Sequence, residues 1–219
     1  MLLALKADYE KKLPKNQAGV QFSFAHVVLA LFLFDMYGKM GRVELENQLS
    51  IGRGSVRTFT ARMKAKLGLI ESSSTKAHIL SDKGKAVMNK IKEEFTLIGN
   101  IPVIFDELKF AKFNALGRLA IPGLDEAKIE QGEPLRLVEA AKAQGGKGLI
   151  SLVIQAGRAL KLLGVPLDMK KRYTSEWIRL NELFSLNERD MLLIAWADSE
   201  LGAKLAVISA AVEALEMMK

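Results

Sequence analysis

The chain has 219 residues, no cysteine, 49% hydrophobic residues and a formal net charge of +7. This length and composition exclude a disordered chain and a disulfide scaffold, and they suffice for two domains with buried cores. The lack of cysteine also excludes thiolate metal sites and cysteine nucleophiles. The N-terminal residues MLLALKADYEKKLPKNQ become charged after five positions and carry no signal-peptide pattern, so we expect a cytoplasmic protein.

The positive charge is concentrated in the first half of the chain. Residues 1–97 contain 16 basic and 9 acidic residues, whereas residues 98–219 contain 16 of each. Within residues 50–92, ten basic residues stand against two acidic ones. Such a concentration is typical of a surface that contacts nucleic acid, although a solvated basic face would give the same count.

The stretch FAHVVLALFLFDMYGKMG predicts a first helix that Ser23 caps and that ends near Tyr37 and Gly38. As a helix, Phe24–Tyr37 would span about 21 Å, against about 30 Å of bilayer hydrocarbon, so we expect no membrane span. Residues 27–34 are all apolar, and a helix that is apolar all round must be covered on every side. We expect Met1–Leu13 and a partner subunit to cover it; the second domain is the other possibility.

Two more helices are predicted after this stretch. VELENQLS, residues 43–50, reads as a short helix, and the glycines of Gly52-Arg53-Gly54 predict a tight turn. Ser55 is then expected to cap a third helix, SVRTFTARMKAKLG, that stops at Gly68. Residues at spacings of three and four form the predicted buried stripe of this helix: Val56, Phe59, Met63 and Leu67.

The opposite face of the third helix is small at its centre and cationic at its margins. Thr58, Ala61 and Ala65 form the centre, and the sequence has no acidic residue between Arg53 and Lys66. Small side chains let a helix lie deep in a groove about 12 Å wide, and basic margins can reach base edges or phosphates. This face is therefore the first candidate for a nucleic-acid contact.

A polar turn at residues 73–76 separates two short apolar segments and predicts a β-hairpin, after which Ser81 caps the helix DKGKAVMNKIKEEF. The order of these elements and the phrase IGRGSVRTFTARMKAKLGLIESSSTKAHILSDKGK resemble the winged helix-turn-helix family of DNA-binding domains over residues 22–95. The resemblance implies insertion of Ser55–Lys66 into the major groove and a phosphate or minor-groove contact by Ser72–His78.

From the resemblance and the helix face together we predict which residues bind DNA. The groove contacts are expected from Arg57, Thr58, Ala61, Arg62 and Lys64. The phosphate contacts are expected from Arg53, Ser55 and Lys76.

The pattern breaks at Gly99, Asn100 and Pro102, which predicts a boundary between a DNA-binding domain, residues 1–97, and a second domain, residues 98–219. Helices and strands alternate in the second domain, which predicts a small α+β domain with a mainly antiparallel sheet. The expected elements are a strand at 109–121, a helix opened by Pro134, a hairpin at 148–165, a helix at 173–184, a strand at 189–196 and a closing helix at 199–217.

No motif for catalysis or cofactor binding is visible in the sequence. The cluster QGGKG, residues 144–148, follows a helix and lacks the spacing of a phosphate-binding loop, so a C-cap turn is the better interpretation. The only histidines, His26 and His78, lack metal-binding spacing, and Asp198 is interpreted as a helix cap. We expect no enzymatic activity, no metal and no cofactor.

The second half also resembles, in IEQGEPLRLVEAAKAQGGKG and LLIAWADSELGAKLAV, a small group of archaeal winged-helix proteins of unknown function with a C-terminal α+β domain. That resemblance implies a domain that senses a small-molecule effector or pairs subunits. We therefore predict a DNA-binding transcriptional regulator that acts on double-stranded DNA as a homodimer. The alternative is an RNA- or protein-binding winged-helix protein whose second domain is a ligand-binding or enzymatic module.

Overall fold

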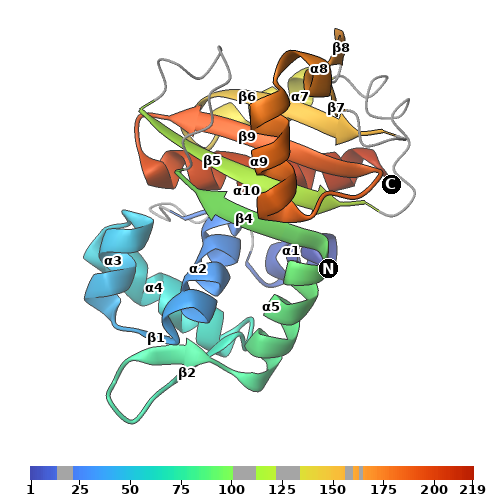
Figure 1. Ribbon diagram of the computed structural model, residues 1–219. Coiled ribbons are helices and arrows are strands. Elements are labelled where there is room, and N and C mark those ends of the chain that lie inside the picture. The colour runs from blue at the N-terminus through green and yellow to red at the C-terminus, as the bar shows by residue number, and fades with distance from the viewer. Residues whose placement is uncertain (14–21, 101–111, 122–133, 156–159, 163–164) are drawn as a thin grey trace. The chain divides into compact units, whose positions relative to one another are not determined.

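The computed structural model describes residues 1–13, 22–100, 112–121, 134–155, 160–162 and 165–219. The chain divides into two compact units, Met1–Lys92 and Glu93–Lys219, which are described separately here (Figure 1). The division lies slightly upstream of the predicted boundary at residue 97. The reason is that Phe95–Gly99 forms a strand of the second unit's sheet, whereas Phe95 was predicted to end the last helix of the first domain. The predicted α+β class is confirmed, because both units combine helices with an antiparallel sheet.

The first unit is built from helices and a small three-stranded sheet. Its helices are α1 Leu2–Lys12, α2 Phe24–Tyr37, α3 Arg42–Leu49, α4 Arg53–Ala65 and α5 Asp82–Glu94. The strands β1 Lys39–Met40, β2 Ile70–Ser72 and β3 His78–Leu80 pair antiparallel in the order β1-β3-β2. The hairpin of β2 and β3 was predicted, whereas β1 was not, since two residues carry no periodic signal.

Helix α2 begins after Ser23 and ends at Gly38, as predicted, and the φ of +74° at Gly38 suits a glycine. All of Phe24–Leu31 is buried. The ring of Tyr9 in α1 lies 5.6 Å from that of Phe24, which confirms that the N-terminal segment packs on this helix. A single chain already buries Phe24–Leu31, so the contribution expected from a partner subunit is not needed there.

Helix α4 begins at Arg53 with Gly52 as its N-cap, so the prediction that Ser55 caps this helix is wrong. Gly52 takes the extended conformation of an N-cap, and Gly54 continues as helix, which places Ser55 inside the first turn. The predicted inward stripe is confirmed, because all four of its residues are almost completely buried: Val56, Phe59, Met63 and Leu67.

The junction of the hairpin and α5 is closely packed. The Ser81 hydroxyl donates a hydrogen bond of 2.6 Å to the carbonyl of Gly68 and accepts one of 3.0 Å from the backbone N–H of Gly84. Ser81 therefore caps α5 as predicted and ties it to the end of α4. A Cβ atom on Gly84 would lie 2.0 Å from the carbonyl oxygen of Leu69, so only glycine allows this approach.

The second unit is a six-stranded sheet with helices on both faces. Its strands are β4 Phe95–Gly99, β5 Phe113–Ala120, β6 Gly146–Ile154, β7 Leu160–Leu162, β8 Val165–Asp168 and β9 Asp190–Ala197. They follow the order β4-β5-β9-β6-β7-β8 with antiparallel pairing, as predicted. The helices are α7 Leu135–Lys142, α8 Met169–Arg172, α9 Thr174–Phe184 and α10 Glu200–Met217.

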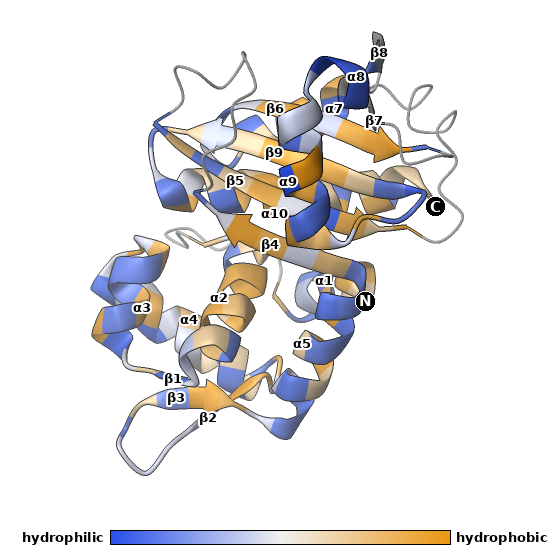
Figure 2. Cartoon of the chain, in the orientation of Figure 1, coloured by the Kyte–Doolittle hydropathy of each residue, from blue (hydrophilic) through white to orange (hydrophobic). Residues whose placement is uncertain are grey.

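The two faces of this sheet are covered by different helices, with α9 in front and α10 behind in Figure 1. Trp177 and Leu180 of α9 pack with Leu192 and Ile194 of the central strand β9. On the other face, a Cβ on Gly117 would lie 2.5 Å from Val207 of α10, so this glycine lets the helix approach the sheet. Figure 2 shows the corresponding hydrophobic colouring along β4, β5 and β9.

One buried ion pair joins two neighbouring strands of this sheet. Arg118 Nε of β5 donates to Asp190 Oδ2 of β9 at 2.7 Å, and the same oxygen accepts the backbone N–H of Asn187 at 2.8 Å. Each partner compensates the charge of the other at a site with little water. The pair is therefore part of the fold of this unit.

The glycine cluster forms the predicted turn after α7, where Gly145 has a φ of +90° and Gly146 begins β6. Lys147 Nζ contacts Asp198 Oδ1 at 2.6 Å. Helix α10 is capped by Ser199, whose hydroxyl accepts the N–H of Gly202 at 3.0 Å, so the prediction that Asp198 caps this helix is wrong.

In the described part of the chain, every helix is too short or too polar to span a bilayer.

Candidate nucleic-acid interface

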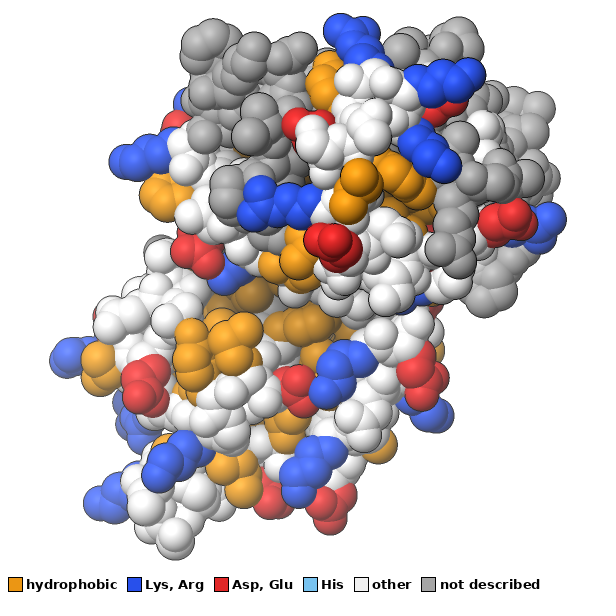
Figure 3. Space-filling view, in the orientation of Figure 1, with side chains coloured by type: hydrophobic (Ala, Val, Ile, Leu, Met, Phe, Trp, Pro, Cys, Tyr) orange, Lys and Arg blue, Asp and Glu red, His pale blue; other side chains and the backbone are white. Residues whose placement is uncertain are grey.

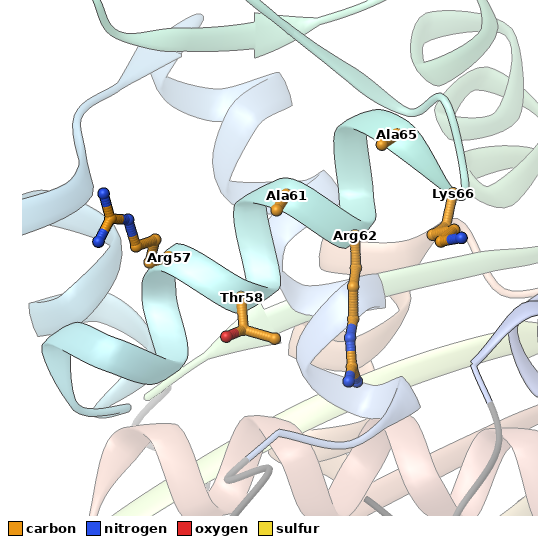
Figure 4. A pocket seen from close by; sticks show the side chains of 6 residues that line it. All are labelled: Arg57, Thr58, Ala61, Arg62, Ala65 and Lys66. Atoms are coloured by element: carbon orange, nitrogen blue, oxygen red, sulfur yellow. The ribbon is translucent and has the colours of Figure 1, made fainter.

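The outward face of α4 carries most of the predicted DNA-binding residues. With its inward stripe buried, the helix leaves Arg57, Thr58 and Ala61 exposed, as predicted. These three, together with Arg62, Ala65 and Lys66, line an open hollow of about 340 Å³. Figure 4 shows Arg57 and Lys66 at the two ends of the row, with Thr58, Ala61, Arg62 and Ala65 between them.

The charged side chains on this face are all basic. The sequence has no carboxylate from residue 47 to residue 70. Arg53, at the start of α4, has a side chain that is 88% exposed, and its Nε lies 3.8 Å from Glu46. An exposed pair at this distance contributes little, so Arg53 can exchange its contact with Glu46 for one with a phosphate.

Thr58 is oriented by its own helix. Its Oγ1 donates to the carbonyl of Gly54 at 3.3 Å, so the hydroxyl is directed to the backbone. The methyl group is the remaining substituent on Cβ, and it contributes to the hollow beside Ala61. The centre of the face is therefore formed by methyl groups.

Arg62, predicted to contact the groove, packs on an aromatic ring of the same unit. Its guanidinium lies 5.3 Å over the ring of Phe22, which in turn packs edge-on against Phe59 at 5.1 Å. This cation–π contact holds the charged group beside the hollow and leaves the stem of Arg62 to line it. Sequence reasoning missed Phe22, and its position next to the cap Ser23 was the only signal.

Lys64 and the hairpin are connected. Lys64 Nζ donates to Ser72 Oγ of β2 at 2.9 Å. On β3, His78 is paired with Met40 of β1 and Ser72 of β2. Burial lowers the pKa of His78, and the charges of Arg42 and Lys64 lower this pKa further, so the imidazole is neutral at pH 7. Because Lys64 already donates to Ser72, the predicted base contact by Lys64 would compete with that bond.

The turn between β2 and β3 projects from the first unit (Figure 1). It is closed by a hydrogen bond of 2.8 Å from the N–H of Ser73 to the carbonyl of Ala77. Lys76, predicted to contact a phosphate, is exposed in this turn with a φ of +61°. Its backbone N–H donates to the carbonyl of Ser73 at 3.2 Å, so the turn is ordered while the ammonium group faces solvent.

No group of three or more histidine and acidic residues in the described ranges is arranged to hold a metal ion. His26 instead accepts the backbone N–H of Ser23 with its Nδ1 at 3.1 Å, at the start of α2. Burial lowers the pKa of His26 to about 4. Its role is thus to cap a buried helix.

Comparisons with known proteins add information about the fold. No protein-family model matches the chain, and no curated protein matches it. A solved structure, hypothetical protein PH0730 from Pyrococcus horikoshii OT3, is similar with a TM-score of 0.65 and 21% sequence identity. The match covers 90% of this chain and 100% of that one. At this identity the similarity is one of fold, and it extends over both units.

Proposed function

We propose that the first unit is a winged helix-turn-helix domain that binds double-stranded DNA, and that the protein is a transcriptional regulator. In this proposal α3 and α4 form the helix-turn-helix, α4 enters the major groove, and the hairpin of β2 and β3 is the wing. The observation that carries the proposal is the outward face of α4, which combines exposed cations with small side chains in a stretch of sequence without carboxylates.

The dimensions of α4 support the major groove as its binding site. Its 13 residues span about 20 Å, and Arg57 and Lys66 lie about 14 Å apart along the helix axis. Between them the hollow presents the small side chains of Thr58, Ala61 and Ala65, and the guanidinium of Arg62 is held over Phe22, so the backbone can approach base edges in a groove about 12 Å wide. Arg53 and Lys76, both exposed, are then available for phosphates on either side.

For the second unit we propose a regulatory role in the cytoplasm, through a small-molecule effector, subunit pairing or both. An exposed apolar surface in the first unit supports a homodimer. Met36 and Tyr37, at the end of α2, and Val43, at the start of α3, are exposed by 70%, 54% and 63%. Figure 3 shows hydrophobic side chains gathered over α2 on this face. Surfaces of this kind mark contacts with other proteins.

The experiment that tests this function compares three nucleic acids of matched sequence. The affinity of the full chain is measured for duplex DNA, single-stranded DNA and a structured RNA, each at two salt concentrations. We expect the duplex to bind most tightly and the affinity to fall steeply with salt, since phosphate contacts release counterions. Preference for the RNA would favour the alternative, an RNA-binding protein with a ligand-binding or enzymatic second unit. Absence of binding to any of the three would contradict DNA and RNA binding alike and would favour the protein-binding form of the alternative.

A further inference from the structure

The proposed DNA contact implies a particular way of reading sequence, because α4 offers few polar groups at its centre. Helix α4, RGSVRTFTARMKA, contains no Asn, Gln, Asp or Glu. It therefore lacks the amide side chains that pair with adenine in the major groove and the carboxylates that accept from cytosine. Its remaining hydrogen-bonding groups are cations, hydroxyls and backbone.

Two of the three hydroxyls of α4 use their proton within the helix. Thr58 Oγ1 donates to the carbonyl of Gly54 at 3.3 Å, and Thr60 Oγ1 donates to that of Val56 at 3.0 Å. Thr60 is in addition buried, so it cannot reach a ligand. The centre of the hollow is thus lined by the methyl groups of Thr58, Ala61 and Ala65 with Arg62 beside them, and Arg57 and Lys66 lie at its ends.

Only one base edge in the major groove is apolar, and that is the C5-methyl group of thymine. Resting on the proposed binding of duplex DNA, we infer that Thr58, Ala61 and Ala65 contact thymine methyl groups and select sites that carry thymine at the centre of each half-site. Ala61 and Ala65 lie about 6 Å apart along the helix axis, close to two base-pair steps of about 3.4 Å. Two thymines separated by one base pair therefore fit Ala61 and Ala65.

The flanking cations define the edges of the same site. Arg57 and Lys66 lie about 14 Å apart, which corresponds to about four base-pair steps. Arg57 is exposed and suits the O6 and N7 acceptors of guanine or a phosphate. The expected half-site is a thymine core with a guanine or a phosphate contact at its border.

The test removes methyl groups one at a time from either partner. Duplexes are first selected from a random library by the full wild-type chain. Each thymine in the best duplex is then replaced by deoxyuridine, which differs only by the methyl group. We expect about a fourfold loss of affinity for each thymine methyl that the helix buries, and little change at the other thymines.

The protein variants are matched to this series. Thr58→Ser deletes the methyl group of Thr58 and keeps the hydroxyl that bonds to Gly54, and Ala61→Gly deletes the methyl group of Ala61. Ala86→Gly, at an exposed position of α5, is the control for the loss of helix propensity. In Thr58→Ser and Ala61→Gly, the deoxyuridine effect should disappear at the thymine that the deleted methyl contacts, whereas Ala86→Gly should keep it.

Two outcomes separate this inference from the proposed function. If the wild type binds the selected duplex with a strong salt dependence but tolerates every deoxyuridine, thymine-methyl readout is overturned and DNA binding stands. If the selection enriches no duplex at all, both are overturned. Circular dichroism of each variant confirms that an affinity change does not come from unfolding.

Discussion

At the scale of single residues, the contact of Arg62 with Phe22 decides how available this cation is to a ligand. A cation over an aromatic ring at the surface is stabilised by about 0.5–1 kcal/mol. We predict a coupling free energy of this size in a double-mutant cycle of Phe22→Leu and Arg62→Met, because leucine keeps bulk and removes the ring. Urea unfolding of the four proteins measures it. Strict additivity of the two substitutions would show that the contact contributes nothing.

His26 gives a prediction for the pH dependence of stability. Burial lowers its pKa from 6.5 to about 4, so the folded state disfavours the imidazolium form. The contribution of the neutral His26 side chain to the free energy of unfolding is fully present above pH 6.5. It is lost as the pH falls from 6.5 through 4, by at most about 3 kcal/mol. Protonation of Nδ1 would also break the bond from the N–H of Ser23.

The matched variant for this prediction is His26→Gln, which keeps an acceptor for the Ser23 N–H in the arrangement of a capping box. Chemical denaturation at several pH values between 4 and 8 should show a shallower loss of stability in the variant than in the wild type. Parallel curves for the two proteins would refute the assignment to His26, since the carboxylates common to both contribute equally.

At the scale of elements, substitution of two helical glycines by alanine should change the stability of the protein in opposite directions. A Cβ at Gly84 would collide with the carbonyl of Leu69, so Gly84→Ala should destabilise the protein by about 1–3 kcal/mol. At Gly54, no described atom lies within 4 Å of such a Cβ, so Gly54→Ala should stabilise α4 by about 0.5–1 kcal/mol. Thermal unfolding of both variants checks the signs. Equal effects would contradict the packing of α5 against the hairpin.

The elements also show how far the sequence predicts the fold. Helices α2, α3, α9 and α10 and the strand β9 were predicted within one or two residues, because their signals are local, whereas α4 was expected to reach Gly68 and ends at Ala65. Strand β4 was missed, since its five residues pair with β5, which begins only at Phe113, and its own sequence contains a glycine. Residues 109–111 of the strand predicted at 109–121 lie outside the described residues.

In the candidate site, too, the features that depend on local sequence were predicted and those that depend on tertiary contacts were not. Which side chains of α4 point outward depends only on the helical repeat, and Arg57, Thr58 and Ala61 are exposed as predicted. The partners of Arg62 and Lys64 could not be predicted, because Phe22 and Ser72 reach them from other elements through the tertiary fold. Ser55 was misplaced because either glycine before it could have ended the turn, and Gly52 does so.

At the scale of the whole molecule, a dimeric regulator should recognise a site with two-fold symmetry. We predict that duplexes selected by the full chain contain a palindrome whose half-sites are about 10 base pairs apart, or a multiple of this distance.

Light scattering at micromolar concentration should give the mass of a dimer, and Tyr37→Glu, which places a charge in the exposed apolar surface, should shift this mass toward that of a monomer. A monomer with an unrepeated site would contradict this assembly.

The central claim is that the outward face of α4 contacts duplex DNA. The most direct test is the salt dependence of duplex affinity for Arg57→Ala/Lys66→Ala, compared with wild type and with Lys85→Ala/Lys90→Ala, a control with the same charge change at exposed positions of α5. The account predicts that the slope of log affinity against log salt becomes shallower by about 0.9 for each phosphate contact removed, in the α4 variant alone. Equal slopes in both double variants would contradict the account.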